Sequence, residues 1–191
     1  MTGIGRNLAV FVVVLAVALA GYVLLGQQQA APQITGTDVN GKPFSLAAWR
    51  GHPVFVDFWA TSCPGCVAEM PRLAALYRQY HDQGFELVAV AMNYDDAAAV
   101  SRFASEHQLP FTVVVDQTGA MAHAFGDIKL TPTAWLISAQ GNIVQQYIGD
   151  PDFAALGKLI ARHGTAERHD LPAVAPSGAS RRGLTRFSSR P

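Results

Sequence analysis

Apolar positions form one long run near the N-terminus of the chain and several short runs further on. Residues 8–25, LAVFVVVLAVALAGYVLL, include no charged side chain. As a helix this run would span roughly 27 Å at about 1.5 Å per residue, close to a hydrocarbon core about 30 Å thick. Arg6 precedes it and no Lys or Arg follows until Lys42, which favours a cytoplasmic N-terminus. The pattern predicts a membrane anchor or signal over residues 1–26.

The length of this run favours an anchor that is kept. A cleaved signal peptide usually has an apolar region of about 7–15 residues, and this one is longer. A small-x-small site at Ala18 and Ala20 leaves cleavage possible. We therefore expect a single-pass protein of the inner (cytoplasmic) membrane, with the rest of the chain in the periplasm or an equivalent extracytoplasmic space.

Short apolar runs alternate with helical periodicity over residues 33–164. Strands are predicted at 53–60, 85–92, 111–116, 133–138 and 142–148, and helices at 64–84, 95–107, 121–126 and 152–163. Asn40-Gly41 predicts a β-hairpin before the first of these strands. This order of elements predicts an α/β sandwich with a mixed sheet.

The two flanks of this domain have a different composition. Residues 27–32, QQQAAP, indicate a short linker. Residues 165–191 are rich in Ser, Pro, Gly, Ala and Arg and show little apolar periodicity, which predicts a disordered, mildly basic tail.

Charge and histidine placement exclude several classes of function. The 14 Lys and Arg balance the 14 Asp and Glu, and no basic stripe interleaved with aromatic residues is present, which argues against binding to nucleic acid. The six histidines show no local ligand spacing, and Val67 stands where covalent haem attachment would need a histidine. We expect no cofactor and no metal.

The only two cysteines, Cys63 and Cys66, enclose Pro64 and Gly65. A bridge between them would close a loop of about four residues, worth about 2 kcal/mol against about 3 for a loop of fifteen, so a purely structural role is a poor use of it. A structural zinc site needs four ligands, and this pair supplies two. Electron transfer remains.

The local geometry expected around these cysteines suits that chemistry. Cys63 ends a strand-to-helix connection, and Pro64 occupies the first helical position, where its missing N–H costs nothing. The amides of Gly65 and Cys66 then point toward the sulfur of Cys63, at the positive end of the helix dipole. Such placement lowers a thiol pKa from about 8.5 to about 7 or below. Cys63 is the expected nucleophile, and Cys66 the residue that resolves its mixed disulfide.

Two stretches resemble the signatures of thioredoxin-fold proteins. VDFWATSCPGCVAEMP (56–71) resembles their active-site stretch, and KLTPTAWLI (129–137) resembles the proline that precedes the strand beside the disulfide. The additional strand and helix over 85–116 and the N-terminal hairpin resemble the TlpA-like branch, which comprises membrane-anchored or periplasmic thiol–disulfide oxidoreductases, including reductases of cytochrome c maturation. The resemblance covers about 33–164. It implies a three-layer thioredoxin-like sandwich with an N-terminal hairpin and a central βα insertion.

The resemblance also implies roles for individual residues. The Thr131-Pro132 bond would be cis and packed against the disulfide, leaving the Thr131 backbone to pair with an extended client segment. Trp59, Pro64 and Gly65 would contribute to the substrate-binding rim.

Asp57 is the expected proton acceptor. It shares a strand face with Phe55 and Trp59, and burial should raise its pKa so that it can take the proton of Cys66. Many TlpA-like relatives have an uncharged residue at this position, so the chain departs from the pattern of that branch. Glu69, three residues after Cys66, is expected to be an exposed helix charge.

The leading hypothesis is therefore an enzyme that reduces disulfides in client proteins, supplied by a membrane dithiol electron donor. The Pro-Gly pair lacks the histidine found between the cysteines of strong periplasmic oxidases, which favours reduction. Two alternatives stay open. A peroxiredoxin-type peroxidase would have Thr where Ala60 stands, and a copper-delivery protein would space its cysteines by three residues and use a downstream histidine, for which His123 is the candidate.

Overall fold

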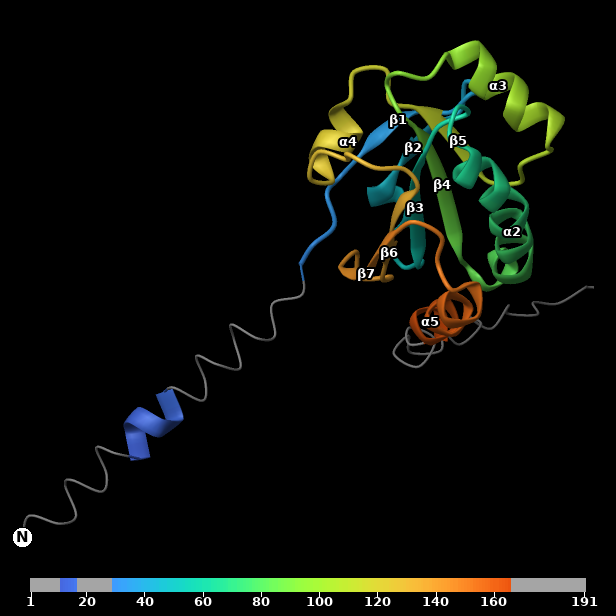
Figure 1. The fold of residues 1–191 in the computed structure, drawn as a ribbon. Coiled ribbons are helices and arrows are strands. Elements are labelled where there is room, and N and C mark those ends of the chain that lie inside the picture. The colour runs from blue at the N-terminus through green and yellow to red at the C-terminus, as the bar shows by residue number, and fades with distance from the viewer. Residues whose placement is uncertain (1–10, 17–28, 166–191) are drawn as a thin grey trace, which may run out of the picture.

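The computed structural model describes residues 11–16 and 29–165 (Figure 1). Residues 11–16 form a short helix. Within these two ranges, no helix combines the length and the apolar character that crossing a bilayer requires. The rest of the predicted anchor, residues 27–28 of the predicted linker and the predicted tail beyond Thr165 lie outside the described residues.

A five-stranded mixed sheet forms the centre of the domain, with strand order β5-β4-β3-β6-β7. Its strands are β3 (Val54–Trp59), β4 (Glu86–Ala91), β5 (Thr112–Val115), β6 (Thr133–Ile137) and β7 (Ile143–Ile148). The central strand β3 pairs parallel with β4 and antiparallel with β6. Each strand lies within a residue or two of its predicted range because the apolar runs end at turn residues, and the mixed sheet is confirmed.

The helices also follow the predicted order. They are α2 (Pro64–Tyr80), α3 (Ala97–Glu106), α4 (Ala120–Ala124) and α5 (Phe153–Thr165), with single-turn 3₁₀ helices η1 (Leu46–Trp49) and η2 (His81–Gln83). Asp96 caps α3, since its carboxylate accepts the N–H of Ala99 at 2.8 Å. Gly84, at φ 93°, ends η2 in the left-handed conformation that glycine adopts without strain. Only η1 was not predicted from the sequence.

The predicted hairpin is formed by β1 (Thr35–Thr37) and β2 (Pro43–Ser45). Its loop has five residues rather than two, because the carboxylate of Asp38 organises it by accepting the N–H groups of Asn40 and Lys42 at 2.8 Å each. The loop also reaches the outer strand β5, where the N–H of Val39 donates to the carbonyl of Val113 at 2.9 Å.

The opposite outer strand, β7, is covered in part by the residues that precede the hairpin. The N–H of Ala31 donates to Gly141, and the N–H of Ile143 donates to Gln29, at 2.9 and 2.8 Å. One segment of about ten residues thus contacts both outer strands of the sheet.

Three layers result (Figure 1). Helices α2, α3 and α5 cover one face of the sheet, over a core that includes Phe55, Trp59 and Cys66. The hairpin, η1 and α4 cover the other face, over a core that includes Val56 and Phe58. The central strand β3 is buried on both sides and ends at Trp59. The short loop that follows it leads to Cys63 at the start of α2.

Candidate active site

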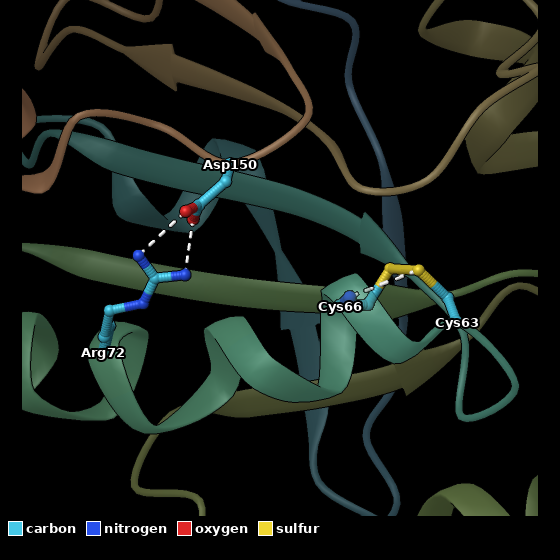
Figure 2. Close-up of polar contacts among 4 residues, drawn as sticks. All are labelled: Cys63, Cys66, Arg72 and Asp150. Carbon is cyan, nitrogen blue, oxygen red and sulfur yellow. Dashed lines mark hydrogen bonds and ion pairs between the residues drawn. A yellow bond between two sulfur atoms is a disulfide. The ribbon is translucent and has the colours of Figure 1, made fainter.

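Cys63 and Cys66 are joined as a disulfide at the start of α2 (Figure 2). Cys63 is the N-cap residue, with extended backbone at φ −97°, and its Sγ accepts the N–H of Cys66 at 3.2 Å. Pro64 occupies the first helical position, as the sequence predicted. Cys63 is partly exposed, whereas Cys66 is only 1% exposed. Only Cys63 is therefore placed to meet a second protein.

The loop before β6 lies against the disulfide. The Thr131-Pro132 bond is cis, as predicted, and the carbonyl oxygen of Thr131 lies 3.6 Å from Sγ of Cys63. The carbonyl of Pro132 accepts the N–H of Gly149 at 2.8 Å, which ties this loop to the end of β7. Over residues 29–165 the Thr131 backbone forms no further hydrogen bond, so it has a free amide beside the reactive sulfur.

Asp57 is buried in the middle of β3, on the face that packs against α2. It is 1% exposed, and within the described part of the chain neither carboxylate oxygen has a hydrogen-bond partner. Burial raises its pKa well above the usual value, and the nearby carboxylate of Glu69 raises that pKa further. The expectation of a raised pKa is confirmed, and Glu69 proves to be the neighbour that adds to it.

The expectation that Glu69 is an exposed helix charge is wrong. It is 1% exposed, and both carboxylate oxygens lack a hydrogen-bond partner among residues 11–16 and 29–165. Its pKa is raised to about 7, mainly by burial and also by Asp150, while Arg72 lowers it. A sequence signal for this burial existed: Glu69 lies three residues after Cys66 and four before Leu73, so all three share the buried face of α2.

Arg72 of α2 forms an ion pair with Asp150, which follows β7 (Figure 2). Nη1 and Nη2 of Arg72 donate to the two carboxylate oxygens of Asp150 at 2.8 and 2.7 Å. The guanidinium also lies 4.7 Å from the ring centroid of Phe153 in α5. Sequence reasoning missed this pair, because its members are 78 residues apart and no local pattern joins them.

The expected role of Trp59 at the substrate-binding rim is corrected. Its side chain is fully buried and packs on Phe103 of α3 with ring centroids 5.1 Å apart, so it belongs to the core. Pro64 and Gly65 are exposed at the first turn of α2, where a client could reach them.

Three large apolar side chains are exposed on segments next to the active-site loops. Leu130 directly precedes Thr131, and Ile148, the last residue of β7, pairs with Thr133; their side chains are 66% and 68% exposed. Tyr94 is 63% exposed. Tyr94 precedes Asp95, whose carboxylate accepts the N–H and the hydroxyl of Thr61 at 2.6 and 2.5 Å. No sequence pattern singles out these three residues, since exposure of an apolar side chain depends on how the loops pack.

The histidine that copper delivery would require has a different neighbour. Nδ1 of His123 lies 2.7 Å from the carboxylate of Asp127. Among the described residues, no group of three or more His, Cys, Asp or Glu side chains could hold a metal ion.

Comparisons with known proteins agree with this geometry. The sequence profile of the Redoxin family matches residues 26–160. The thiol-disulfide oxidoreductase ResA of Bacillus thuringiensis subsp. konkukian (strain 97-27) is 36% identical over 120 residues, which cover 63% of this chain and 68% of that protein. ResA of Bacillus subtilis (strain 168) is 33% identical over 130 residues, 68% of this chain and 72% of that protein.

Solved structures show the same fold. A thiol:disulfide interchange protein of the thioredoxin family from Chlorobium tepidum TLS superposes with a TM-score of 0.67 at 27% identity, over 72% of this chain and 97% of that one. The thioredoxin domain of a thiol-disulfide oxidoreductase from Bacteroides vulgatus gives 0.62 at 26% identity, over 70% and 96%. With an exposed Cys63, a buried Cys66 and the cis-proline loop in place, the chain belongs to the Redoxin family as a thiol–disulfide oxidoreductase of the thioredoxin fold.

Proposed function

We propose that the chain is a membrane-anchored extracytoplasmic oxidoreductase that reduces disulfides in client proteins, including those of cytochrome c maturation. The observation that carries this proposal is the position of Cys63. Its sulfur accepts an amide at the start of α2, is partly exposed, and lies beside the backbone of Thr131. A nucleophile, a buried resolving partner and a backbone site for an extended segment thus occur together.

The reaction transfers two electrons from the dithiol to the client. The thiolate of Cys63 attacks one sulfur of the client disulfide, the client S–S bond breaks, and the other client sulfur leaves as a thiolate. Cys66 then loses its proton to a neighbouring carboxylate and attacks Sγ of Cys63. The second client sulfur leaves as a thiolate, and the disulfide between Cys63 and Cys66 is restored. Both released client thiolates take protons from solvent.

Asp57 and Glu69 are the candidates to accept the proton of Cys66. Both carboxyl groups are buried without hydrogen-bond donors, and burial holds the pKa of each above its usual value. A carboxyl group with a pKa near the working pH can accept and return a proton in each cycle. The Glu69 pKa of about 7 meets this condition.

The surface around Cys63 supports a protein client rather than a small molecule. Leu130 directly precedes Thr131, Ile148 pairs with Thr133, and both expose apolar area, as does Tyr94; such exposed apolar area commonly marks protein contacts. An extended client segment would pair with the free Thr131 amide by strand addition and cover Leu130 and Ile148.

The buried carboxyl groups also support the reductive direction. Strong oxidants of this fold hold their reduced form as a stabilised thiolate. Glu69 lies one helical turn from Cys66 and interacts with Asp57; when ionised, these buried carboxylates disfavour additional negative charge on the dithiol, which makes the reduced form a better electron donor. No histidine stands between the cysteines to offset them.

The proposed location is supported by the apolar run over 8–25 and the charge asymmetry around it. A reductase outside the cytoplasm must be reduced again by a donor in the membrane, so a membrane dithiol protein is the proposed partner. Fractionation of cells that express the full chain checks the anchor: the protein should remain with the membrane after a high-salt wash.

Trapping tests the activity. A Cys66→Ser variant keeps the nucleophile but cannot resolve, so it should accumulate mixed disulfides with clients through Cys63, visible on non-reducing gels and named by mass spectrometry. The Cys63→Ser/Cys66→Ser double variant is the matched control and should trap nothing. A reduction potential below about −200 mV is expected for the wild type, and a value well above it would reverse the proposed direction.

A further inference from the structure

The ion pair between Arg72 and Asp150 lies close to the reacting groups, and the reaction proposed above gives it no role. Cys66, Glu69 and Arg72 are spaced three residues apart and follow one face of α2, from the buried sulfur to the surface. Asp150 comes from the loop after β7, and its neighbour Gly149 donates to the carbonyl of Pro132. The pair therefore connects the helix of the cysteines to the loop of the cis proline.

The pair lies at the outer end of that helix face. The side chains of Arg72 and Asp150 are 46% and 53% exposed, whereas Glu69, one turn closer to the sulfurs, is 1% exposed. The bidentate hydrogen bonds to Asp150 and the cation–π contact with the ring of Phe153 hold the guanidinium of Arg72 in one orientation.

We propose that Arg72 and Asp150 are a pair of positioning residues that sets the pH at which Glu69 exchanges its proton while Cys66 resolves the mixed disulfide. The pair places a positive and a negative charge beside a buried carboxyl group that has no hydrogen-bond donor of its own. Neither residue touches the sulfurs, so both act through Glu69. This inference rests on the proposed function.

The electrostatics support the geometry. Asp150 raises the pKa of Glu69 and Arg72 lowers it. Among the described residues, further titratable groups in this region are Asp57 of β3, whose pKa burial and Glu69 raise, and Tyr147 of β7, which packs against Phe55 and whose pKa burial and Asp152 raise. Because the two charges act in opposite directions, removing the charge of Arg72 should raise the pKa of Glu69, and removing the charge of Asp150 should lower it.

The test uses two variants that break the same ion pair, Arg72→Gln and Asp150→Asn. The titration of Glu69 is followed directly in the oxidised protein by ¹³C NMR of labelled carboxyl groups. Its midpoint should rise in Arg72→Gln and fall in Asp150→Asn, each by about 0.5 pH unit or more, as expected for half-exposed charges close to the group. The pH profile of mixed-disulfide resolution should move with it.

Further variants separate this role from a structural one. Arg72→Lys should keep the midpoint near that of the wild type, and the Arg72→Gln/Asp150→Asn double variant should return it there, since both charges are gone. In a Glu69→Gln background, neither single substitution should move the resolution profile.

The outcomes are distinct from those of the trapping experiment. Shifts of the Glu69 midpoint in the same direction in both single variants, or no shift in either, would reduce the pair to a structural contact and overturn the inference. So would opposite shifts that the resolution profile does not follow. Because the NMR titration needs no client, absence of trapped clients would count against the proposed function and leave this readout intact.

Discussion

Two buried aspartates on opposite sides of the sheet differ in one respect. Asp57, in β3, and Asp116, just after β5, are 1% and 2% exposed. A carboxylate oxygen of Asp116 accepts the N–H of Ala122 at 2.8 Å, which anchors α4 to the sheet. Both oxygens of Asp57 lack a donor.

The same contrast extends to the other buried polar side chains. Thr133 donates its hydroxyl to the carbonyl of Leu130, and the hydroxyl of Ser138 accepts the N–H of Asn142. Glu69, in contrast, has no partner. Leaving a buried polar group unpaired costs about 1–3 kcal/mol, so unpaired groups within one cluster indicate a use other than stability. In this chain the unpaired carboxyl groups are Asp57 and Glu69; Glu69 adds to the effect of burial in raising the pKa of Asp57 and lies one helical turn from Cys66.

The largest expected effect concerns turnover. Asp57→Asn keeps the shape of the side chain but cannot accept a proton at physiological pH, so resolution of the mixed disulfide should slow by on the order of 10²-fold. Single-turnover reduction of a model disulfide measures it. Asp116→Asn is the matched control, since its amide oxygen can still accept from Ala122, and its rate should equal that of the wild type. If Asp57→Asn resolved the mixed disulfide as fast as Asp116→Asn, Asp57 would have no role in proton transfer.

The second effect concerns stability. Asp116→Ala leaves the N–H of Ala122 unpaired in a buried position, so the free energy of unfolding should fall by about 1–3 kcal/mol. Denaturant unfolding of the oxidised protein measures this loss. Turnover per folded molecule should stay the same. A large loss of turnover at full stability would place Asp116 in the reaction.

The third effect is a dependence of stability on pH. The folded-state pKa of Glu69 is raised from its usual 4.5 to about 7, so the folded state binds more protons than the unfolded state between these values. Stability should therefore fall as pH rises through this window, and Asp57 acts in the same direction.

Glu69→Gln should remove the Glu69 contribution to this slope. The gain in unfolding free energy over the wild type should be small at pH 4 and reach on the order of 1 kcal/mol or more at pH 8. Denaturant titrations at the two pH values measure it. A gain that does not change with pH would mean that folding leaves the pKa of Glu69 at its usual value.

The smallest effect is expected at Ser138. Its hydroxyl accepts the N–H of Asn142 at 3.2 Å near the β6–β7 turn, far along the chain from the cysteines. Ser138→Ala should cost about 0.5–1.5 kcal/mol and leave turnover unchanged. Thermal unfolding detects a change of this size. It sets the scale for a paired polar group that has no role in the reaction.

Local sequence patterns predicted the elements and the dithiol well. Apolar runs with turn residues at their ends located the strands, and the order of Cys63 and Pro64 at a strand-to-helix junction predicted the N-cap sulfur that the structure has. These features depend on neighbours within a few residues, so the sequence alone was sufficient.

The parts that could not be predicted depend on tertiary packing. The chemical type of Glu69 favours an exposed charge, although its spacing places it on the buried face of α2. The pairing of Arg72 with Asp150 and the burial of Trp59 under Phe103 join distant segments. No periodicity in a single sequence specifies such contacts.

The coverage of both outer strands by residues 29–39 has a consequence for self-association. An open strand edge is a template onto which another chain can add, and native proteins usually block it. Here Gln29 and Ala31 occupy part of the edge of β7, while Val39 occupies part of the edge of β5. A truncation that removed residues up to 33 would uncover the β7 edge and should favour dimers or aggregates, even though every cysteine remained in place.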